Sequence, residues 1–121
     1  MHLRTQLLRL LLAPLFLTGY HLRAADETPP VLQNVLPAAD TAVVELRRVE
    51  VFFSEDVQGV DVTDLLINGT PATNMAIVQA SQYQFEFPTP PNGTVQIAWA
   101  SGNGITDLEG NPFAGGSWTY N

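Results

Sequence analysis

The sequence predicts an all-β protein that folds as an antiparallel β-sandwich, and three observations support this prediction. Hydrophobic residues alternate with polar residues at a period of two rather than 3.6. Gly, Pro, Asn and Asp residues interrupt these stretches about every eight to twelve residues, as turns do. About seven such strands fit into roughly 90 residues, which is the pattern of an immunoglobulin-like (Ig-like) sandwich.

The clearest strands are three segments in which one apolar row faces one side. These rows are Val49, Val51 and Phe53; then Tyr83, Phe85 and Phe87; then Val95, Ile97 and Trp99. An antiparallel strand with one face on the core requires this alternation. Four shorter strands are expected at residues 31–36, 65–67, 75–79 and 117–120. Since the chain has no cysteine, the two inner faces must be held together by packing alone.

Local turn signals fix the connections between these strands. Asn68-Gly69 is a dipeptide that tolerates positive φ at both central positions of a tight hairpin turn. Asn92-Gly93 is expected to play the same role before the strand that starts at Thr94. Asp61 or Asp64 is expected to cap a short helical turn over residues 62–65.

Residues 1–25 are interpreted as a secretory signal peptide, which leaves residues 26–121 as one Ig-like domain. Arg4 and Arg9 precede an apolar run over residues 10–17, and a polar stretch then ends at Ala24 and Ala25. The run is broken by Pro14 and is shorter than the ~20 residues of a membrane-spanning helix. Cleavage after Ala24 or Ala25 is favoured over a short uncleaved anchor. In both cases the rest of the chain is expected to be exported and to be secreted or displayed on the cell surface. After cleavage, no membrane insertion is expected.

The part after the signal peptide is strongly acidic. It keeps all 12 acidic residues but only two basic ones, Arg47 and Arg48, so its formal charge is −10. Such a surface repels nucleic acids and other acidic polymers, and self-repulsion favours a soluble monomer. An exposed edge strand can pair with a second copy, but the sequence does not indicate which strand would do so.

The composition argues against an enzyme. The chain has no cysteine and no lysine, and both histidines, His2 and His21, lie in the signal peptide. This removes the usual nucleophiles, bases and zinc ligands. Only carboxylates remain, with Glu55 and either Asp107 or Glu109 as a nominal pair for glycoside hydrolysis. A domain this small has no deep cleft to shelter a sugar ring, so no catalytic site and no cofactor are expected.

A calcium site is the alternative that the acidic residues leave open. Asp107, Glu109 and Asn111 alternate in a glycine-containing loop, and Ca²⁺ prefers such oxygen ligands. The loop lacks the length and the closing glutamate of an EF-hand. The competing interpretation is a turn in which the Asp and Asn side chains hydrogen-bond to local amides.

Two further groups of residues have a functional and a structural interpretation. Glu55, Asp56, Asp61 and Asp64 surround Gly59 and are expected to be solvated loop charges. The rings of Tyr83, Trp99, Trp118 and Tyr120 would bind carbohydrate if they formed an exposed strip. Their register with the apolar rows predicts that they belong to the core instead.

Three segments carry a resemblance to a known family. They are Thr28-Pro29-Pro30-Val31, then Val51-Phe52-Phe53-Ser54-Glu55 with Val57 two residues on, then Ile105-Thr106-Asp107-Leu108-Glu109-Gly110-Asn111-Pro112-Phe113. In this order they resemble the bacterial Ig-like domain first described in S-layer proteins, the SbsA-type Ig-like domain. The resemblance covers residues 26–120. Asp56 stands where the family commonly has Pro, which affects a turn and not the fold.

The resemblance implies a β-sandwich that serves as a spacer or display unit in secreted and surface proteins. Residues 60–73 and 93–100 are similar to a subgroup of these modules found beside lamin-tail domains. The resemblance therefore implies a non-catalytic structural or adhesive module whose partners are neighbouring modules, surface proteins or polysaccharide. A calcium-dependent or carbohydrate-binding surface module is the alternative function.

Overall fold

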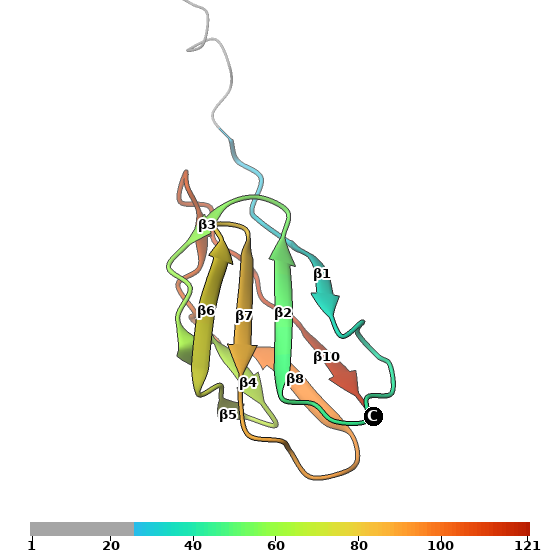
Figure 1. The fold of residues 1–121 in the computed structure, drawn as a ribbon. Coiled ribbons are helices and arrows are strands. Elements are labelled where there is room, and N and C mark those ends of the chain that lie inside the picture. Colours follow the sequence, from blue (N-terminus) through green and yellow to red (C-terminus); the bar gives the residue numbers. More distant parts are fainter. Residues whose placement is uncertain (1–25) are drawn as a thin grey trace, which may run out of the picture.

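Two antiparallel sheets face each other in a computed structural model of the chain, which describes residues 26–121 (Figure 1). The first sheet has the order β1 (Leu32–Leu36), β2 (Arg48–Phe53), β7 (Gln82–Glu86) and β6 (Asn74–Gln79). The second has the order β10 (Ser117–Tyr120), β8 (Val95–Trp99), β4 (Leu65–Ile67) and β5 (Thr70–Pro71). The short strands β3 (Val57–Gln58) and β9 (Thr106–Asp107) pair with each other separately.

This architecture confirms the predicted all-β, Ig-like sandwich. All seven expected strands form, within one residue of the expected ends for most of them. The additional strands β3, β5 and β9 are two residues long, too short to show an alternating pattern. The predicted signal peptide, residues 1–25, lies outside the described residues. No helix within residues 26–121 has the length and apolar character needed to cross a membrane.

The core lies between the two sheets and is built from the predicted apolar rows. Val49 and Val51 on β2 and Phe85 on β7 are fully buried. Phe85 also belongs to a cluster of four aromatic rings. Neighbouring ring centroids in this cluster are 5.2 to 5.8 Å apart, and most of these pairs meet edge to face. The rings belong to Phe53, Phe85, Trp99 and Phe113. This packing holds the sheets together in the described part of the chain, which contains no disulfide.

The two Asn-Gly turns have different outcomes. Asn68-Gly69 joins β4 to β5 with φ values of 50° and 83°, so the predicted tight hairpin is confirmed. The expectation for Asn92-Gly93 is wrong, because β7 and β8 belong to different sheets. Residues 87–94 therefore cross from one sheet to the other, and no hairpin forms there.

The predicted helical turn is confirmed as a single 3₁₀ turn, η2 (Val62–Asp64). Asp61 caps it by accepting a hydrogen bond from the Val62 amide, and the Asp64 side chain accepts one from the Asp61 amide at 2.7 Å. Asp64 is buried, so the expectation that it would be a solvated charge is wrong. Burial raises its pKa above the usual value for an aspartate.

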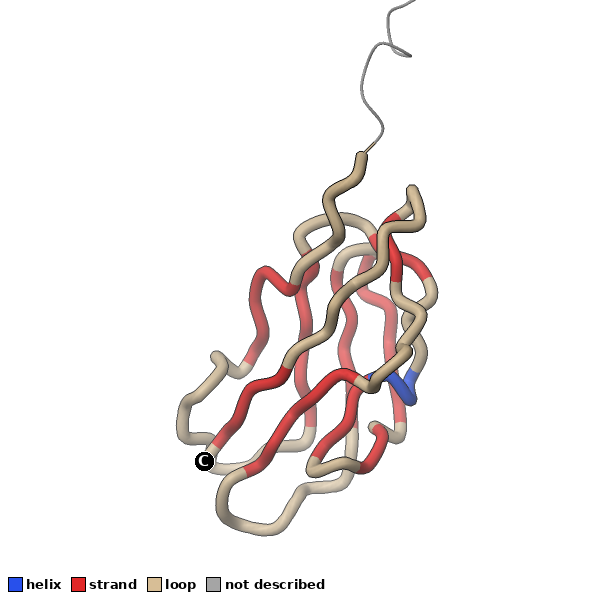
Figure 2. Tube along the Cα trace, turned by 180° about the vertical axis from the view of Figure 1, so that it is seen from behind, coloured by secondary structure: helices blue, strands red, loops and turns tan. Residues whose placement is uncertain are grey.

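The chain enters and leaves the sandwich near opposite ends of its long axis (Figures 1 and 2). The last strand, β10, is bordered on its outer side by residues 40–43, which run parallel to it. The Asp40 amide donates to the Thr119 carbonyl at 2.8 Å, and the Val43 amide donates to the Asn121 carbonyl at 2.7 Å. The Asn121 amide donates back to the Thr41 carbonyl at 3.1 Å. An N-terminal segment and the C-terminal strand therefore close this side together.

Candidate functional site

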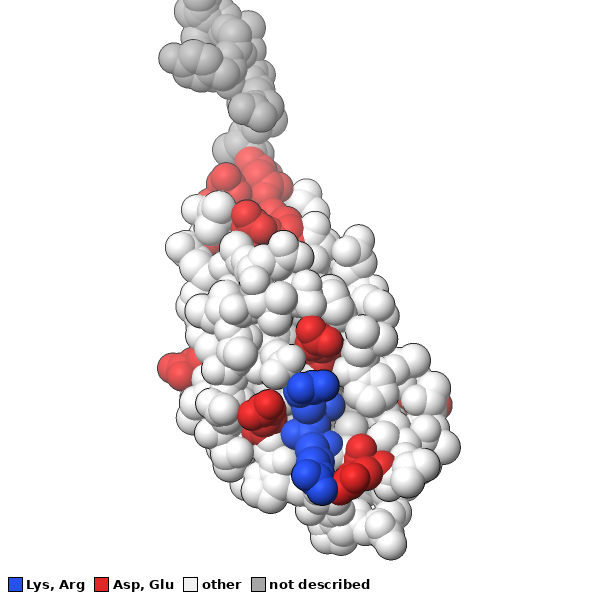
Figure 3. Space-filling model, in the orientation of Figure 1, with Lys and Arg blue, Asp and Glu red and all other residues white. Residues whose placement is uncertain are grey.

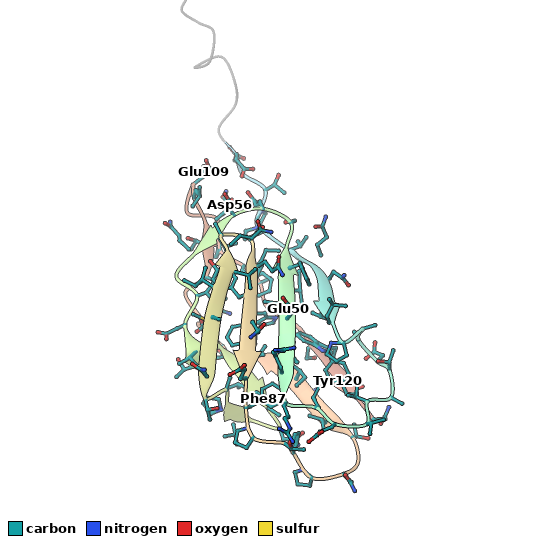
Figure 4. All side chains as sticks on the ribbon, in the orientation of Figure 1. Glu50, Asp56, Phe87, Glu109 and Tyr120 are labelled. Carbon is teal, nitrogen blue, oxygen red and sulfur yellow. The ribbon has the colours of Figure 1, made fainter. Side chains whose placement is uncertain are left out.

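Four carboxylates meet at the end of the sandwich where the chain enters, and we call this group the acidic end. One oxygen from each of Asp26, Glu55, Asp107 and Glu109 lies within 4.8 Å of the others. Figure 3 shows acidic residues gathered at this end, and Figure 4 labels Glu109 and Asp56 there. The four residues come from three segments that are distant in the sequence.

Backbone pairing brings these segments together. The Ser54 amide donates to the Val31 carbonyl at 2.8 Å, and the Val31 amide donates to the Ser54 hydroxyl oxygen at 3.0 Å. Strand β3 pairs with β9 through the register Val57 to Asp107. Glu55 precedes β3 and Asp107 ends β9, so this small sheet sets their separation. Two of the segments that carry the resemblance, residues 51–55 and 105–113, supply three of the four carboxylates, and the third segment, residues 28–31, follows shortly after Asp26.

Asp107 is the structural centre of the acidic end. Its side chain is fully buried, and one oxygen accepts hydrogen bonds from the Glu109 and Asn111 amides at 3.0 and 2.8 Å. The other oxygen accepts one from Asn111 Nδ2 at 2.8 Å. Burial alone would raise the pKa of Asp107, but these hydrogen bonds, led by the one from the Asn111 side chain, outweigh it and lower the pKa.

Asn111 ties the start of the domain to this loop. Its Nδ2 also donates to the Asp26 carbonyl oxygen at 2.8 Å. The side-chain nitrogen of Asn111 therefore faces Asp107 and Asp26, so the side chain acts here as a donor. These contacts match the turn interpretation, in which Asp and Asn side chains satisfy local groups.

The pKa of Glu55 is raised, whereas that of Asp107 is lowered. Desolvation raises the pKa of Glu55, and the negative charges of Asp26 and Asp107 nearby raise it further. Ionisation of Glu55 is therefore opposed by its surroundings. A cation placed among the four carboxylates would relieve that repulsion.

The sequence identified part of this group. Of the three predicted metal ligands, Asp107 and Glu109 belong to the group of four carboxylates. Asn111 lies beside it and donates a hydrogen bond to Asp107. Asp26 was missed, because it lies in a polar segment 85 residues before its contact with Asn111 and no local pattern marks it. Glu55 was grouped with Asp61 and Asp64, from which the structure separates it, because those two form the η2 cap. Its other predicted partners, Asp107 and Glu109, do lie beside it.

The structure bears on two other arrangements considered from the sequence. Of the two nominal pairs for glycoside hydrolysis, the one between Glu55 and Asp107 is disfavoured, because Asp107 is fully buried and both its oxygens accept hydrogen bonds. The four aromatic side chains of the suggested carbohydrate strip are all buried, with Trp118 the most exposed at 8%. They are core residues, as their register predicted.

Glu55→Gln is expected to raise the midpoint of thermal unfolding at pH 7 slightly, because it removes repulsion within the acidic end. The folded-state pKa of Glu55 is raised, so its ionised form costs stability at neutral pH and this cost disappears as the pH falls through that pKa. The gain should therefore shrink to nothing below about pH 4. Circular dichroism melts between pH 3 and pH 8 measure this.

A matched control is Glu27→Gln, which removes the same charge from an exposed residue outside the four-carboxylate group. An equal gain in both variants would mean that overall charge matters and the acidic end does not.

The ionised carboxylate of Asp107, unlike that of Glu55, adds to the stability of the folded state. Its lowered pKa gives stability that is present at neutral pH and is lost as the pH falls through the folded-state value.

Comparison with known proteins supports the fold class and goes no further. No family model matches the chain, and no curated protein matches it. Among solved structures, the chain is similar to PcoC, described as a methionine-rich copper resistance protein from Escherichia coli. The TM-score is 0.55 at 19% sequence identity, over 77% of this chain and 97% of PcoC. At this identity the likeness shows a shared β-sandwich fold.

Proposed function

We propose that this chain is a non-catalytic structural module of the SbsA-type Ig-like kind, exported to the cell surface or secreted. The placement of its two ends carries the proposal. Asp26 and Asn121 lie near opposite ends of the long axis, so modules joined in series would extend along that axis (Figure 1). The absence of histidine, lysine and cysteine after residue 25 supports a role without catalysis.

The hydrogen bonds between residues 40–43 and β10 suit such a module to carrying tension. Residues 40–43 and β10 run parallel to each other. A pull that acts on the two ends of the domain in opposite directions therefore slides residues 40–43 along β10. Their three backbone hydrogen bonds are then loaded together. The bonds between β1 and β2 are loaded along the strands as well. Bonds that must break together resist force better than bonds that open one at a time.

Single-molecule force measurements test this proposal. The chain has no cysteine, so Glu27→Cys with Asn121→Cys provides unique attachment points at the two ends. As the control, Asn92→Cys with Asn121→Cys pulls β10 away from the start of β8, where Tyr120 pairs with Val95. We expect a several-fold higher unfolding force in the first geometry. Equal forces in the two geometries would contradict a role in bearing tension.

The structural likeness to PcoC does not by itself suggest copper binding here. Copper sites in proteins use thiolate, thioether or imidazole ligands. This chain has two methionines, Met1 and Met75, and both histidines precede residue 26. Met75 is partly buried against the core. We therefore propose that the shared sandwich is used without a copper site.

A calcium-dependent surface module is the second candidate, favoured by the four converging carboxylates. Excess Ca²⁺ is expected under this alternative to raise the unfolding midpoint by several degrees relative to chelator, because a ligand that binds only the folded state stabilises it. Glu109→Gln should abolish the response while leaving the Asp107 turn intact. Mg²⁺ at equal ionic strength controls for charge screening. An unchanged midpoint in wild type would eliminate this candidate.

A further inference from the structure

Strand β6 is an edge strand whose only protective feature is an irregular register between Ile77 and Gln79 at its end. Its outer side pairs with no other strand of the described chain (Figure 1). Its six residues, Asn74–Gln79, contain no charge and no proline. Exposed edges in natural sheets normally carry charges, prolines or covering segments, because bare backbone groups pair with other chains.

The other three edges of the two sheets are closed or blunted. Residues 40–43 cover β10. Strand β5 is two residues long and ends at Pro71. Strand β1 has an irregular register between Leu32 and Asn34 and is bounded by Pro30 and Pro37. Only β6 keeps a regular stretch of four paired residues, 74–77, beside an open side.

Two apolar side chains on β6 are left uncovered. Ile77 pairs with the buried Tyr83 and therefore faces the core side of the sheet, yet it is 67% exposed. Val78 next to it is 52% exposed. The corresponding edge strand of the other sheet, β5, is only two residues long, and most of the Ile77 side chain remains uncovered. These side chains add an apolar contact to the free backbone groups.

We propose that β6 pairs antiparallel with β6 of a second copy of this chain, about a twofold axis. Among the edge strands of the two four-stranded sheets in the described residues, β6 has the longest regular uncovered stretch, so β6 of a second copy is its best-matched partner, and a twofold contact closes after two copies. The segment is uncharged, so pairing places no like charges opposite each other, although each copy carries a formal charge of −10 after residue 25.

The size of the contact sets its strength. Stable complexes bury about 800 Å² on each partner, and six strand residues provide less than that. The dimer should therefore be reversible and appear only at high concentration, with the monomer expected from the sequence present below it. Repulsion between the acidic copies opposes association, so added salt should strengthen the dimer.

Sedimentation velocity across a concentration series, using the chain from Asp26 that contains the whole described core, tests the proposal. Wild type should shift from monomer to dimer, and Ile77→Lys should weaken association at least ~10-fold, because the lysine removes an apolar contact and places a charge on the pairing edge. Val78→Lys is a second variant at the same edge. Val44→Lys is the matched control, because Val44 is fully exposed and lies in no strand.

Hydrogen exchange on wild type gives a readout that needs no variant. Amides of residues 74–79 should exchange more slowly as concentration rises, while amides of β1 should not change. A chain that stays monomeric at the highest soluble concentration would overturn the proposal. A dimer that both lysine variants retain, or species that grow beyond two copies, would also overturn it.

Discussion

Phe85→Ala is expected to lower the free energy of unfolding by ~3–5 kcal/mol. Phe85 is fully buried in the centre of β7, and its ring centroid lies 5.8 Å from that of Trp99. Removing the ring leaves a cavity between the two sheets and also removes an edge-to-face aromatic contact. Domains of this size are commonly stable by only ~5–15 kcal/mol, so the loss is a large fraction of the total.

Urea unfolding of wild type and variant, followed by tryptophan fluorescence, measures this loss. Gln84→Ala on the same strand is the control, because Gln84 points to the outer face and is partly exposed. We expect the control to change the free energy of unfolding by less than ~1 kcal/mol. A Phe85→Ala variant as stable as the control would mean that the space between the sheets is not packed around this ring.

The strands were predictable because their signal is local and repeats. On β2 and β8, large apolar residues that become buried recur at every second position over six and five residues, which is long enough to distinguish a strand from a helix. Strand β5 has two exposed residues and no such signal. The η2 cap was also predictable, because the capping residues Asp61 and Asp64 lie three positions apart.

Features that depend on distant partners were not predictable in the same way. Asn68-Gly69 and Asn92-Gly93 are the same dipeptide, but only the first joins two strands of one sheet. Sheet membership depends on the whole fold and not on the dipeptide. Asp64 is buried because the connection after β8 packs near it, with the Ala100 amide donating to the Asp64 carbonyl at 2.7 Å. No residue near Asp64 in the sequence indicates that contact.

The acidic end combines both cases. The loop containing Asp107, Glu109 and Asn111 was recognisable from its alternating oxygen-bearing side chains. Its meeting with Asp26 requires the entry segment to pass beside it, and its meeting with Glu55 requires β3 to pair with β9. The sequence therefore indicated one loop of the candidate site, while the fold determined the full group of four carboxylates.

Gly59→Ala is expected to lower the free energy of unfolding by ~2–4 kcal/mol. Gly59 has a φ of 81°, a conformation that costs an alanine ~1–2 kcal/mol. A Cβ at this position would also lie 2.5 Å from the Gly104 carbonyl oxygen, so the backbone of one of the two loops would have to move. The loops concerned follow β3 and precede β9, which form the small sheet beneath the acidic end.

Gly102→Ala separates the two contributions, because Gly102 also has a positive φ of 68° but has open space where its Cβ would lie. This control should lose only the ~1–2 kcal/mol that a left-handed backbone costs an alanine. The difference between the variants then measures the close approach of residues 59 and 104. Equal losses in urea unfolding would show that this contact is loose, and that the loop before β9 is free to adjust without disturbing Asp107.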